Sequence, residues 1–494
     1  NFYILTQKLD KEKIDELQKE INQKLLEFHK GELYIALGWT DLTEEDFKKE
    51  LFPEKWKEVT DKFIELKKRK FSEILEENNF EKIFGPIDNG GETKRCNACK
   101  NEAEKLYEID EYNFCPLCKS FIDLSNELKD ADYEIEIYKP EKKDIESGTY
   151  LDILSKFEHN VYFVKNPKIP VKGEHVTVYT LNNTDFLGGS LDNKTTYGFK
   201  FLPKHVPKES LVDIAQDARG IKQIGILRMD VDNLGKIFAE GLKEKGTPSR
   251  VSTISTMLSV FFEGYLNKFI KSFSNERKIN EEDIYLIYSG GDDSFIIGAW
   301  DLIVDSASRI YNEFREFTCE NPDITLSGGI AIVDPKFPVY KGAELAGNAL
   351  EKAKSEGKDK ISVFGEPFKW KSEFNTVIEL KEVLCKLFDK EVSRALLYRI
   401  YETYADFEVF RKELKNREIT VHRIWLLHYY LRRFKEMYGK KNEEINNLLE
   451  KIEKIYNSVI WSNIAWTDKK ILNKPEIIPV AVRWTELLTR GEKE

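Results

Sequence analysis

The sequence has 494 residues, of which 33% are charged, and its formal net charge at pH 7 is −10. A chain of this length exceeds one hydrophobic core, so we expect about two to four domains. The acidic balance excludes an overall nucleic-acid-binding surface and leaves only a local one. No apolar run is long enough to span a bilayer and no signal-peptide pattern opens the chain, which predicts a soluble, cytoplasmic protein without membrane contacts.

Strand and helix patterns alternate at the start of the chain. Phe2–Leu5 and Glu32–Leu37 predict strands, whereas Ile14–Phe28 has apolar residues at spacings typical of an amphipathic helix. A long charged helical region follows from about Glu45 to Glu77. Because the chain starts inside a strand, and a strand without sheet partners is unstable, we expect upstream residues to complete this unit.

Six cysteines are present. Cys319 and Cys385 are isolated and are expected to be buried small hydrophobes. The other four form two Cys-x-x-Cys pairs separated by fifteen residues: Cys96, Cys99, Cys115 and Cys118. Two thiolate pairs at this spacing typically fold around one tetrahedral Zn²⁺. A pair of disulfides is the alternative, which a cytosolic redox poise disfavours. We therefore predict a structural zinc site with four protein ligands.

Residues 126–217 show no chemical motif. The β-rich stretches Asn160–Val164 and His175–Tyr179 are separated by loops that contain proline, glycine and asparagine. This pattern predicts a linker segment with its own small sheet.

The next region opens with a strand that ends in carboxylates. Ile224–Met229 predicts a strand, Asp230 and Asp232 fall at its end, and Asn233 begins a helix. Farther on, Tyr285–Gly298 predicts two strands joined by a tight turn.

The turn of this hairpin carries the strongest chemical signal. Gly290 and Gly291 supply backbone freedom, and Asp292 and Asp293 follow on the turn. Adjacent carboxylates repel each other unless a cation is present. If the strand that ends at Asp230 lies beside the hairpin, the carboxylates form a hard-oxygen site for Mg²⁺ or Mn²⁺, of the two-metal kind that serves phosphoryl transfer. Taken alone, the hairpin could equally be an ordinary polar turn.

A third element follows the hairpin. Ile324–Val333 predicts a strand, and Ala346–Ile361 predicts a helix, a glycine turn and a strand. Lys354 lies at the end of this helix and Lys358 in the turn, where both can meet triphosphate oxygens. A solvated helix end is the alternative for these lysines.

The end of the chain, residues 367–494, reads as helical and rich in aromatic and charged residues. One stretch combines both kinds: Trp425, Tyr429, Tyr430, Arg432 and Arg433. Such mixtures can bind nucleic acid, but aromatic stripes on helices are more often core. We expect a core with an interaction face.

Three motifs together resemble the palm of GGDEF-type nucleotidyl cyclases: the Asp-x-Asp strand end (230–232), the Gly-Gly-Asp-Asp hairpin (290–293) and the Ala-Lys-x-x-Gly-Lys-Asp-Lys tail (353–360). The first part of the chain looks like half of a second palm without the hairpin motif, and would then not be catalytic. A coincidence between two common strand–helix–strand units is the alternative.

The whole combination resembles the large palm-domain subunit of type III CRISPR–Cas effector complexes (the Cas ten family), most closely the type III-A Csm large subunit. This resemblance implies an α+β chain with two ferredoxin-like palms, a four-Cys zinc module and a helical C-terminal domain. The expected domains are a first palm-like domain (1–86), the zinc module (87–125), a linker segment (126–217), the second palm (218–366) and the helical domain (367–494).

The resemblance also implies a function. Members sit in a crRNA-guided antiviral complex and convert ATP to cyclic oligoadenylates when target RNA pairs with the guide. The implied partners are a RAMP-type subunit that holds the crRNA 5′ handle, a small helical effector subunit, crRNA and target RNA. Many members carry an N-terminal His-Asp nuclease domain. This sequence has no His-Asp dipeptide, so we expect a chain without that domain and without DNase activity.

The resemblance assigns roles to individual residues. The expected catalytic carboxylates are Asp230, Asp292 and Asp293. The expected ligands of Mg²⁺ or Mn²⁺ are these three side chains and the carbonyl of Val231, with Asp232 a weaker candidate. The expected nucleotide contacts are Asn233, Ser289, Gly290, Gly291, Lys354 and Lys358.

Three alternatives stay open. A diguanylate cyclase would consume GTP instead of ATP, and it would carry one palm and a sensory domain. A non-catalytic scaffold would bind nucleotide without turnover, although the three aspartates argue against it. A template-directed polymerase would need fingers and thumb domains, which the sequence does not show.

Overall fold

The computed structural model describes residues 3–7, 10–47, 51–75, 80, 84–85, 94–141, 145–168, 172–186, 195–202, 210–242, 247–277, 283–416, 424–464 and 474–490. The chain divides into two compact units, one of residues Asn1–Lys204 with Leu234–Val260 and the other of residues His205–Asn233 with Phe261–Glu494. Among the described residues, none of the helices combines the length and the apolar character that crossing a membrane requires.

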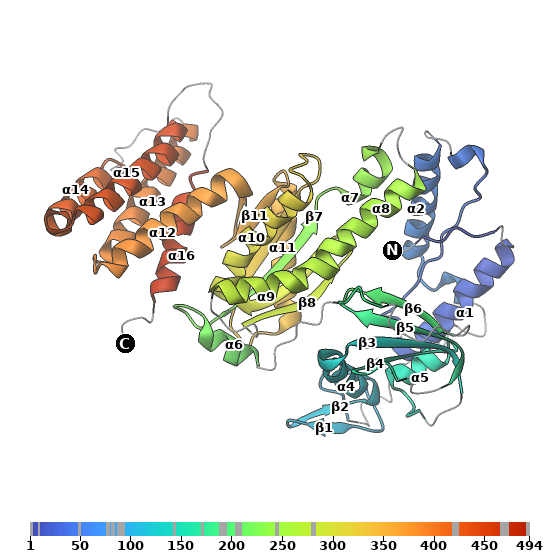
Figure 1. Cartoon of the computed structure of the whole chain (residues 1–494). Helices are drawn as coiled ribbons and strands as arrows, with labels where there is room; N and C mark the ends of the chain where they lie inside the picture. The colour runs from blue at the N-terminus through green and yellow to red at the C-terminus, as the bar shows by residue number, and fades with distance from the viewer. Residues whose placement is uncertain are drawn as a thin grey trace. The chain divides into compact units, whose positions relative to one another are not determined.

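A six-stranded mixed sheet forms the centre of the second unit, with the strand order β12–β11–β10–β7–β9–β8 (Figure 1). Strand β7 pairs antiparallel with both β9 and β10, whereas β10 runs parallel to β11. The strands are β7 (Ile224–Val231), β8 (Ile284–Gly290), β9 (Asp293–Ala299), β10 (Leu326–Val333), β11 (Lys360–Val363) and β12 (Glu366–Lys369). The predicted strands of this region are confirmed.

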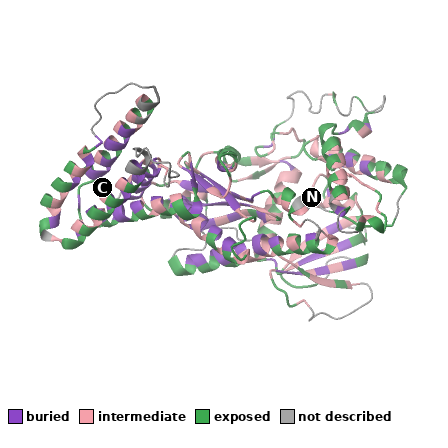
Figure 2. Cartoon of the chain, turned by 90° about the horizontal axis from the view of Figure 1, so that it is seen from above, coloured by how far each residue is buried: buried purple, intermediate pink, exposed green. Residues whose placement is uncertain are grey.

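Helices cover both faces of this sheet. On one face, Ile224 and Ile226 of β7 pack with Ala215 of α6 (Leu211–Asp217) and Ala346 of α11 (Val339–Ser355). The other face lies against α10 (Trp300–Phe317), which comes so close that a Cβ on Gly225 would lie 2.8 Å from Cβ of Ile303. Because both faces are covered, β7 is fully buried from Ile224 to Leu227, and buried residues fill the central strands (Figure 2).

The hairpin β8–β9 has a two-residue turn. Gly290 and Asp293 are register partners, so Gly291, with a φ of 66°, and Asp292 form the turn. Asp293 is thus the first residue of β9 and not a turn residue as expected. A register shift between Leu286 and Tyr288 marks a β-bulge in β8.

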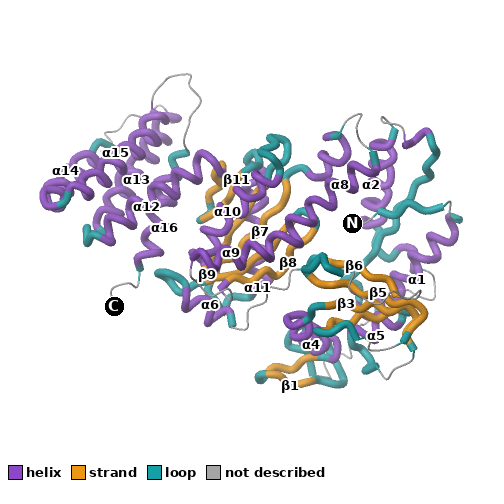
Figure 3. Tube along the Cα trace, viewed as in Figure 1, coloured by secondary structure: helices purple, strands orange, loops and turns teal. Residues whose placement is uncertain are grey.

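Beyond β12 the chain is helical where it is described (Figure 3). Trp484 stacks on Phe374, with ring centroids 6.0 Å apart, and joins the last helix to the core. Leu427 and Leu431 are buried, whereas Trp425 and Tyr429 are 58% and 47% exposed, so leucines and not these two aromatic residues form the core of this stretch. An interaction role for the exposed face stays a prediction. The remaining helices of this unit are η5 (Val260–Tyr265), α9 (Leu266–Arg277), η7 (Trp370–Phe374), α12 (Asn375–Asp389), α13 (Ala395–Asn416), α14 (Leu426–Tyr438), η8 (Gly439–Lys441), α15 (Glu443–Ile464) and α16 (Ile477–Thr489).

The first unit contains a four-stranded sheet in the order β4–β3–β5–β6, with a core of Ile135, Ile137, Val176 and Val178. A two-stranded ribbon, β1–β2, belongs to the cysteine-rich region. The strands are β1 (Tyr107–Ile109), β2 (Tyr112–Phe114), β3 (Tyr133–Pro140), β4 (His159–Val164), β5 (Gly173–Leu181) and β6 (Thr195–Lys200). The helices are α1 (Lys11–His29), η1 (Glu45–Phe47), α2 (Phe52–Lys68), η2 (Ser72–Ile74), α4 (Pro116–Asp130), α5 (Tyr150–Ser155), α7 (Leu234–Lys236), η3 (Ile237–Gly241) and α8 (Pro248–Ser259).

The two predicted strands near the start of the chain are wrong. Residues 3–7 and 33–40 form no strand, and Phe2 lies outside the described residues. The backbone of the second segment pairs with side chains of α1: Asn22 bonds both the N–H and the carbonyl of Ile35, and Gln18 accepts from Leu37 N–H at 2.8 Å. Side-chain amides thus take the place that a neighbouring strand would occupy. The predicted helix over 14–28 is confirmed as α1.

Candidate functional site

Three carboxylates meet at one end of the central strands of the second unit. Asp230 near the end of β7 is the register partner of Asp293 at the start of β9. The N–H of Val231 donates to the carbonyl of Asp292 at 3.0 Å, which ties the end of β7 to the hairpin turn. The strand end and the hairpin therefore lie side by side, which is the condition that the sequence analysis set for a shared carboxylate site.

Burial and mutual repulsion disfavour the charged forms of these carboxylates. Burial, followed by the charges of Asp230 and Asp293, raises the pKa of Asp292 to about 6. Burial also raises the pKa of Asp230 and of Asp293 above the ordinary range. A bound cation would reduce the repulsion between the ionised carboxylates. Carboxylate oxygens are the ligands that Mg²⁺ and Mn²⁺ prefer.

Two lysines of the predicted segment 353–360 lie beside the carboxylates at the end of β7. Lys354, in the last turn of α11, makes an ion pair with Asp230. Lys358, in the turn before β11, contacts the side-chain oxygen of Asn233. The backbone of Asn233 is in the left-handed region, with a φ of 58°. The chain thus brings Lys354, Lys358 and Asn233 together around the strand end.

The side chain of Asp232 is buried and is held by hydrogen bonds within the protein. The side chain is 1% exposed and accepts hydrogen bonds from Thr325 Oγ1 at 2.8 Å, Ser327 Oγ at 2.7 Å and Asp359 N–H at 3.0 Å. Because both its oxygens accept hydrogen bonds from buried or partly buried donors, Asp232 stabilises the junction of β7, β10 and β11. It is not among the residues that we assign to the metal site.

Ser289 and Gly291 pair with the η5 segment. Ser289 is 2% exposed and donates to the carbonyl of Phe262 at 2.6 Å, whereas the expectation was a nucleotide contact. The N–H of Gly291 donates to the carboxylate of Glu263 at 3.3 Å. The hairpin turn is therefore anchored on a π-helical segment, a feature frequent at functional sites.

Sequence reasoning missed two charged neighbours of the carboxylates. Glu263 has no local motif, and only the fold brings it to the hairpin. Arg228 lies two residues before Asp230 on β7, and the two-residue period of a strand places both on one face. The two-residue spacing of Arg228 and Asp230 could therefore have predicted from the sequence that Arg228 lies near the carboxylates.

The four cysteines of the first unit form one cluster whose sulfur atoms all lie within 4.8 Å of one another. The Sγ atoms of Cys99 and Cys115 are 3.8 Å apart, and all four thiols are free. Four sulfurs at the usual zinc distance on the corners of a tetrahedron lie roughly 3.8 Å apart, which fits, whereas a disulfide needs about 2 Å. Burial opposes ionisation of Cys96, but backbone N–H groups lower its pKa to about 7.

Cys319 does not match the expectation of a buried hydrophobe. It is exposed and has a left-handed backbone, with a φ of 51°, in the turn that follows α10. Cys385 is buried on α12, as expected.

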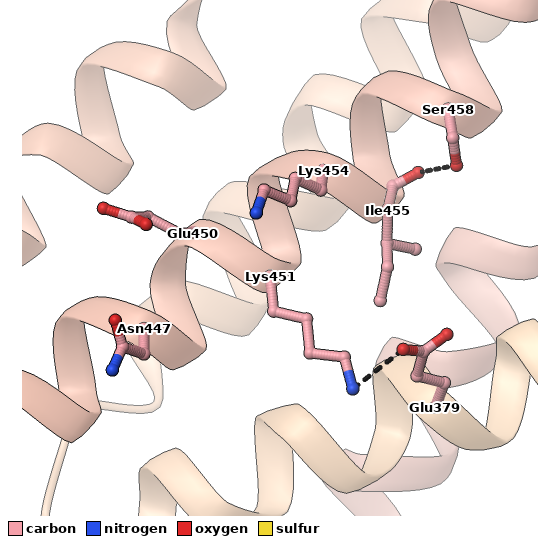
Figure 4. A pocket seen from close by; sticks show the side chains of 7 residues that line it. All are labelled: Glu379, Asn447, Glu450, Lys451, Lys454, Ile455 and Ser458. Carbon is pink, nitrogen blue, oxygen red and sulfur yellow. Dashed lines mark hydrogen bonds and ion pairs between the residues drawn. The ribbon is translucent and has the colours of Figure 1, made fainter.

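A hollow of about 550 Å³ lies between α12 and α15 (Figure 4). An ion pair of 2.8 Å between Lys451 Nζ and Glu379 Oε1 crosses it. Its other lining residues are Asn447, Glu450, Lys454, Ile455 and Ser458. We assign no chemistry to it.

Comparisons with known proteins agree with this geometry. A family model described as "Cas10/Cmr2, second palm domain" matches residues 223–362, and one described as "Csm1 subunit domain B" matches residues 1–86. The chain is 34% identical over 430 residues to the "CRISPR system single-strand-specific deoxyribonuclease Cas10/Csm1 (subtype III-A)" of Methanocaldococcus jannaschii, covering 75% of this chain and 52% of that protein. It is 28% identical over 399 residues to the protein of the same description in Enterococcus italicus, covering 78% and 48%.

Solved structures share the fold. The apo Csm1–Csm4 cassette has a TM-score of 0.66 at 19% identity, covering 97% of this chain and 60% of that chain. A Csm1–Csm4 cassette in complex with cA4 has a TM-score of 0.63 at 18% identity and covers 97% of this chain and 60% of that chain. The chain spans about half the length of the curated relatives that it matches.

The fold and the carboxylate site define a palm-domain protein of the Cas10/Cmr2 type. The chain belongs to the Cas10/Csm1 family, the large subunits of subtype III-A CRISPR systems.

Proposed function

We propose that this chain carries the nucleotidyl-transfer site of a crRNA-guided type III-A complex and converts ATP to cyclic oligoadenylates when target RNA binds. The observation that carries the proposal is the juxtaposition of Asp230, Asp292 and Asp293 at one sheet end, with Lys354 on the same carboxylate group. Solved Csm1–Csm4 cassettes with one ATP, pppApA and cA4 support it.

The chemistry follows from the charges at this end of the sheet. A divalent ion held by the three carboxylates, and by the Val231 carbonyl, would lower the pKa of an attacking ribose hydroxyl and neutralise charge on the α-phosphate and the leaving pyrophosphate. Lys354 pairs with Asp230 here and would transfer to a triphosphate oxygen on nucleotide binding. Lys358 and Asn233 would hold the same triphosphate from the adjoining turn.

We assign structural Zn²⁺ to Cys96, Cys99, Cys115 and Cys118. Four sulfur ligands close a tetrahedral site and leave no position for a substrate. The assignment rests on the separation of the sulfur atoms given above. The zinc ion would hold the β1–β2 ribbon against the start of α4, whose N-cap is Cys115.

The architecture that we propose has two palms. The second palm (218–366) would be catalytic, and the first (1–86), which matches the model of Csm1 subunit domain B, would be its inactive counterpart. The palm assignment of 1–86 rests on the resemblance alone, because its described residues form helices and no strand. The zinc module (87–125), the linker segment (126–217) and the helical domain (367–494) complete it. The proposed partners are a Csm4-type RAMP subunit, as in the related solved complexes, a small helical subunit, crRNA and target RNA.

The curated relatives are named for a second activity, cleavage of single-stranded DNA. This chain has no His-Asp dipeptide among its 494 residues. We therefore propose nucleotidyl transfer, and not DNA cleavage, as the activity of these residues.

The proposal is tested by pyrophosphate release with Mn²⁺ and ATP or GTP, using the chain alone and in its complex with target RNA. Release with ATP that is lost in the Asp292→Ala/Asp293→Ala variant supports it. Release with GTP alone favours a diguanylate-type enzyme. Nucleotide binding without release under either condition favours a scaffold.

A further inference from the structure

A second row of side chains lies directly behind the carboxylates on the same face of the sheet. The first row, across β7, β9 and β8, is Asp230, Asp293 and Gly290. Two residues back along each strand, the register pairs Arg228 with Phe295, and Phe295 with Tyr288. Successive residues on one face are roughly 7 Å apart, which is about the reach of a nucleotide laid across both rows.

The β-bulge in β8 puts Tyr288 in this row. In an unbroken strand, Tyr288 would share a face with Leu286, which is 1% exposed and lies in the core. The register shift after Leu286 turns Tyr288 to the face of Phe295, where it is 49% exposed. Bulges often re-aim a side chain next to a functional site.

Arg228 sits at the other end of the row. Its guanidinium lies against α11 at Gly347, where a Cβ would be 3.0 Å from Nη1. Within the described part of the chain, this guanidinium has no hydrogen-bond or ion-pair partner, and its positive charge offsets part of the rise in the pKa of Asp293 that burial causes. A half-buried guanidinium without a partner favours an anion.

We propose that Arg228, Phe295 and Tyr288 form a nucleotide-binding floor beside the carboxylates, with Arg228 contacting a phosphate and the two rings supporting the base or ribose. The ligand class is an adenine nucleotide. This inference rests on the proposed function. The burial of Tyr288 and its charge interaction with Asp293, which both raise the pKa of Tyr288, agree with two adjoining rows.

The ligand series ATP, ADP, AMP and adenosine separates the two roles. Affinities are measured by titration calorimetry on the 494-residue chain with Mn²⁺. Arg228→Met keeps the apolar stem and removes the charge, so ATP binding weakens on the order of tenfold or more, and adenosine binding does not change. Tyr288→Ala weakens ATP and adenosine alike by on the order of tenfold, and Tyr288→Phe retains binding.

Matched controls come from the same unit. Arg309→Met removes a surface arginine that pairs with Glu276, and Tyr340→Ala removes an exposed tyrosine in the first turn of α11. Both are expected to bind every ligand as the parent does. Thermal unfolding of each variant shows whether it is folded.

The outcomes distinguish a failure of the nucleotide-binding floor from a failure of the proposed nucleotidyl-transfer function. Parent-like affinities of Arg228→Met and Tyr288→Ala, with ATP binding still lost in Asp292→Ala/Asp293→Ala, overturn the floor and leave the transfer site standing. An equal loss of ATP and adenosine in Arg228→Met overturns the phosphate contact. A parent chain that binds no adenine nucleotide overturns both proposals.

Discussion

Asp230 and Asp293 face each other as register partners across the β7–β9 ladder, and Asp292 lies one residue beyond. Like charges placed opposite each other in a sheet are destabilising. Lys354 compensates only part of this charge, because it pairs with Asp230. The group is therefore arranged for a ligand that brings positive charge, and its cost to the metal-free fold can be measured.

The first prediction concerns pH. The pKa of Asp292 in the fold is about 6, above its ordinary value of 3.8, so folding disfavours its ionised form. The metal-free protein should lose stability as the pH rises from about 4 to about 6, and Mn²⁺ should bind more weakly as the pH falls through 6, because the proton competes. Thermal unfolding in EDTA between about pH 4 and 7, and Mn²⁺ titration between about pH 5 and 7.5, check this. Asp292→Asn should flatten both dependences, and an unchanged slope would contradict the assignment.

The second prediction separates a structural aspartate from a functional one. Asp232→Ala leaves the donors of Thr325, Ser327 and Asp359 without an acceptor, so the free energy of unfolding should fall by at least about 2 kcal/mol. Asp230→Ala removes repulsion and should leave the metal-free stability unchanged or higher. Urea unfolding in EDTA measures both. Equal losses would mean that Asp230 is structural too.

The third prediction uses two lysines of one helix end. Lys354 contacts Asp230, whereas Lys352 donates to the carbonyl of Gly365 at 2.5 Å, away from the carboxylates. Lys354→Ala should weaken ATP binding on the order of tenfold through the lost phosphate contact. Lys352→Ala is the matched control and should bind as the parent does. Similar affinities for the two variants would remove Lys354 from the nucleotide site.

The fourth prediction concerns the cysteine cluster. The purified chain should contain one zinc ion, measured by atomic emission, and chelation should lower the melting temperature of the first unit. Cys99→Ser and Cys118→Ser should lose the metal. Cys319→Ser, a change at an exposed cysteine outside the cluster, should keep it. Stoichiometric zinc in the Cys99→Ser variant would contradict a four-sulfur site.

Local patterns in the sequence predicted much of the second unit. The hairpin around Gly291 and the strand that ends near Asp230 could be predicted from the sequence, because turn glycines and apolar runs are short-range signals. The meeting of Asp230 with Asp293 followed from a resemblance to a known palm. It did not follow from either pattern alone.

The failures have physical causes. The segment 33–40 looks like a strand by composition, but pairing is a tertiary property, and Asn22 supplies the hydrogen bonds instead. The burial of Ser289, which was expected to contact a nucleotide, depends on the bulge in β8, because one inserted residue reverses the faces that a regular strand predicts. Glu263 is brought to the hairpin by the fold from an unrelated part of the sequence.

The most direct test of the central claim is the identity of the product. The chain, assembled with its partner subunits, crRNA and target RNA, is incubated with ATP and Mn²⁺, and the products are identified by chromatography and mass spectrometry. Cyclic adenylate oligomers are the expected product, and they should disappear in the Asp292→Ala/Asp293→Ala variant. Oligomers that persist in that variant, or ATP that stays intact with the parent chain, would contradict it.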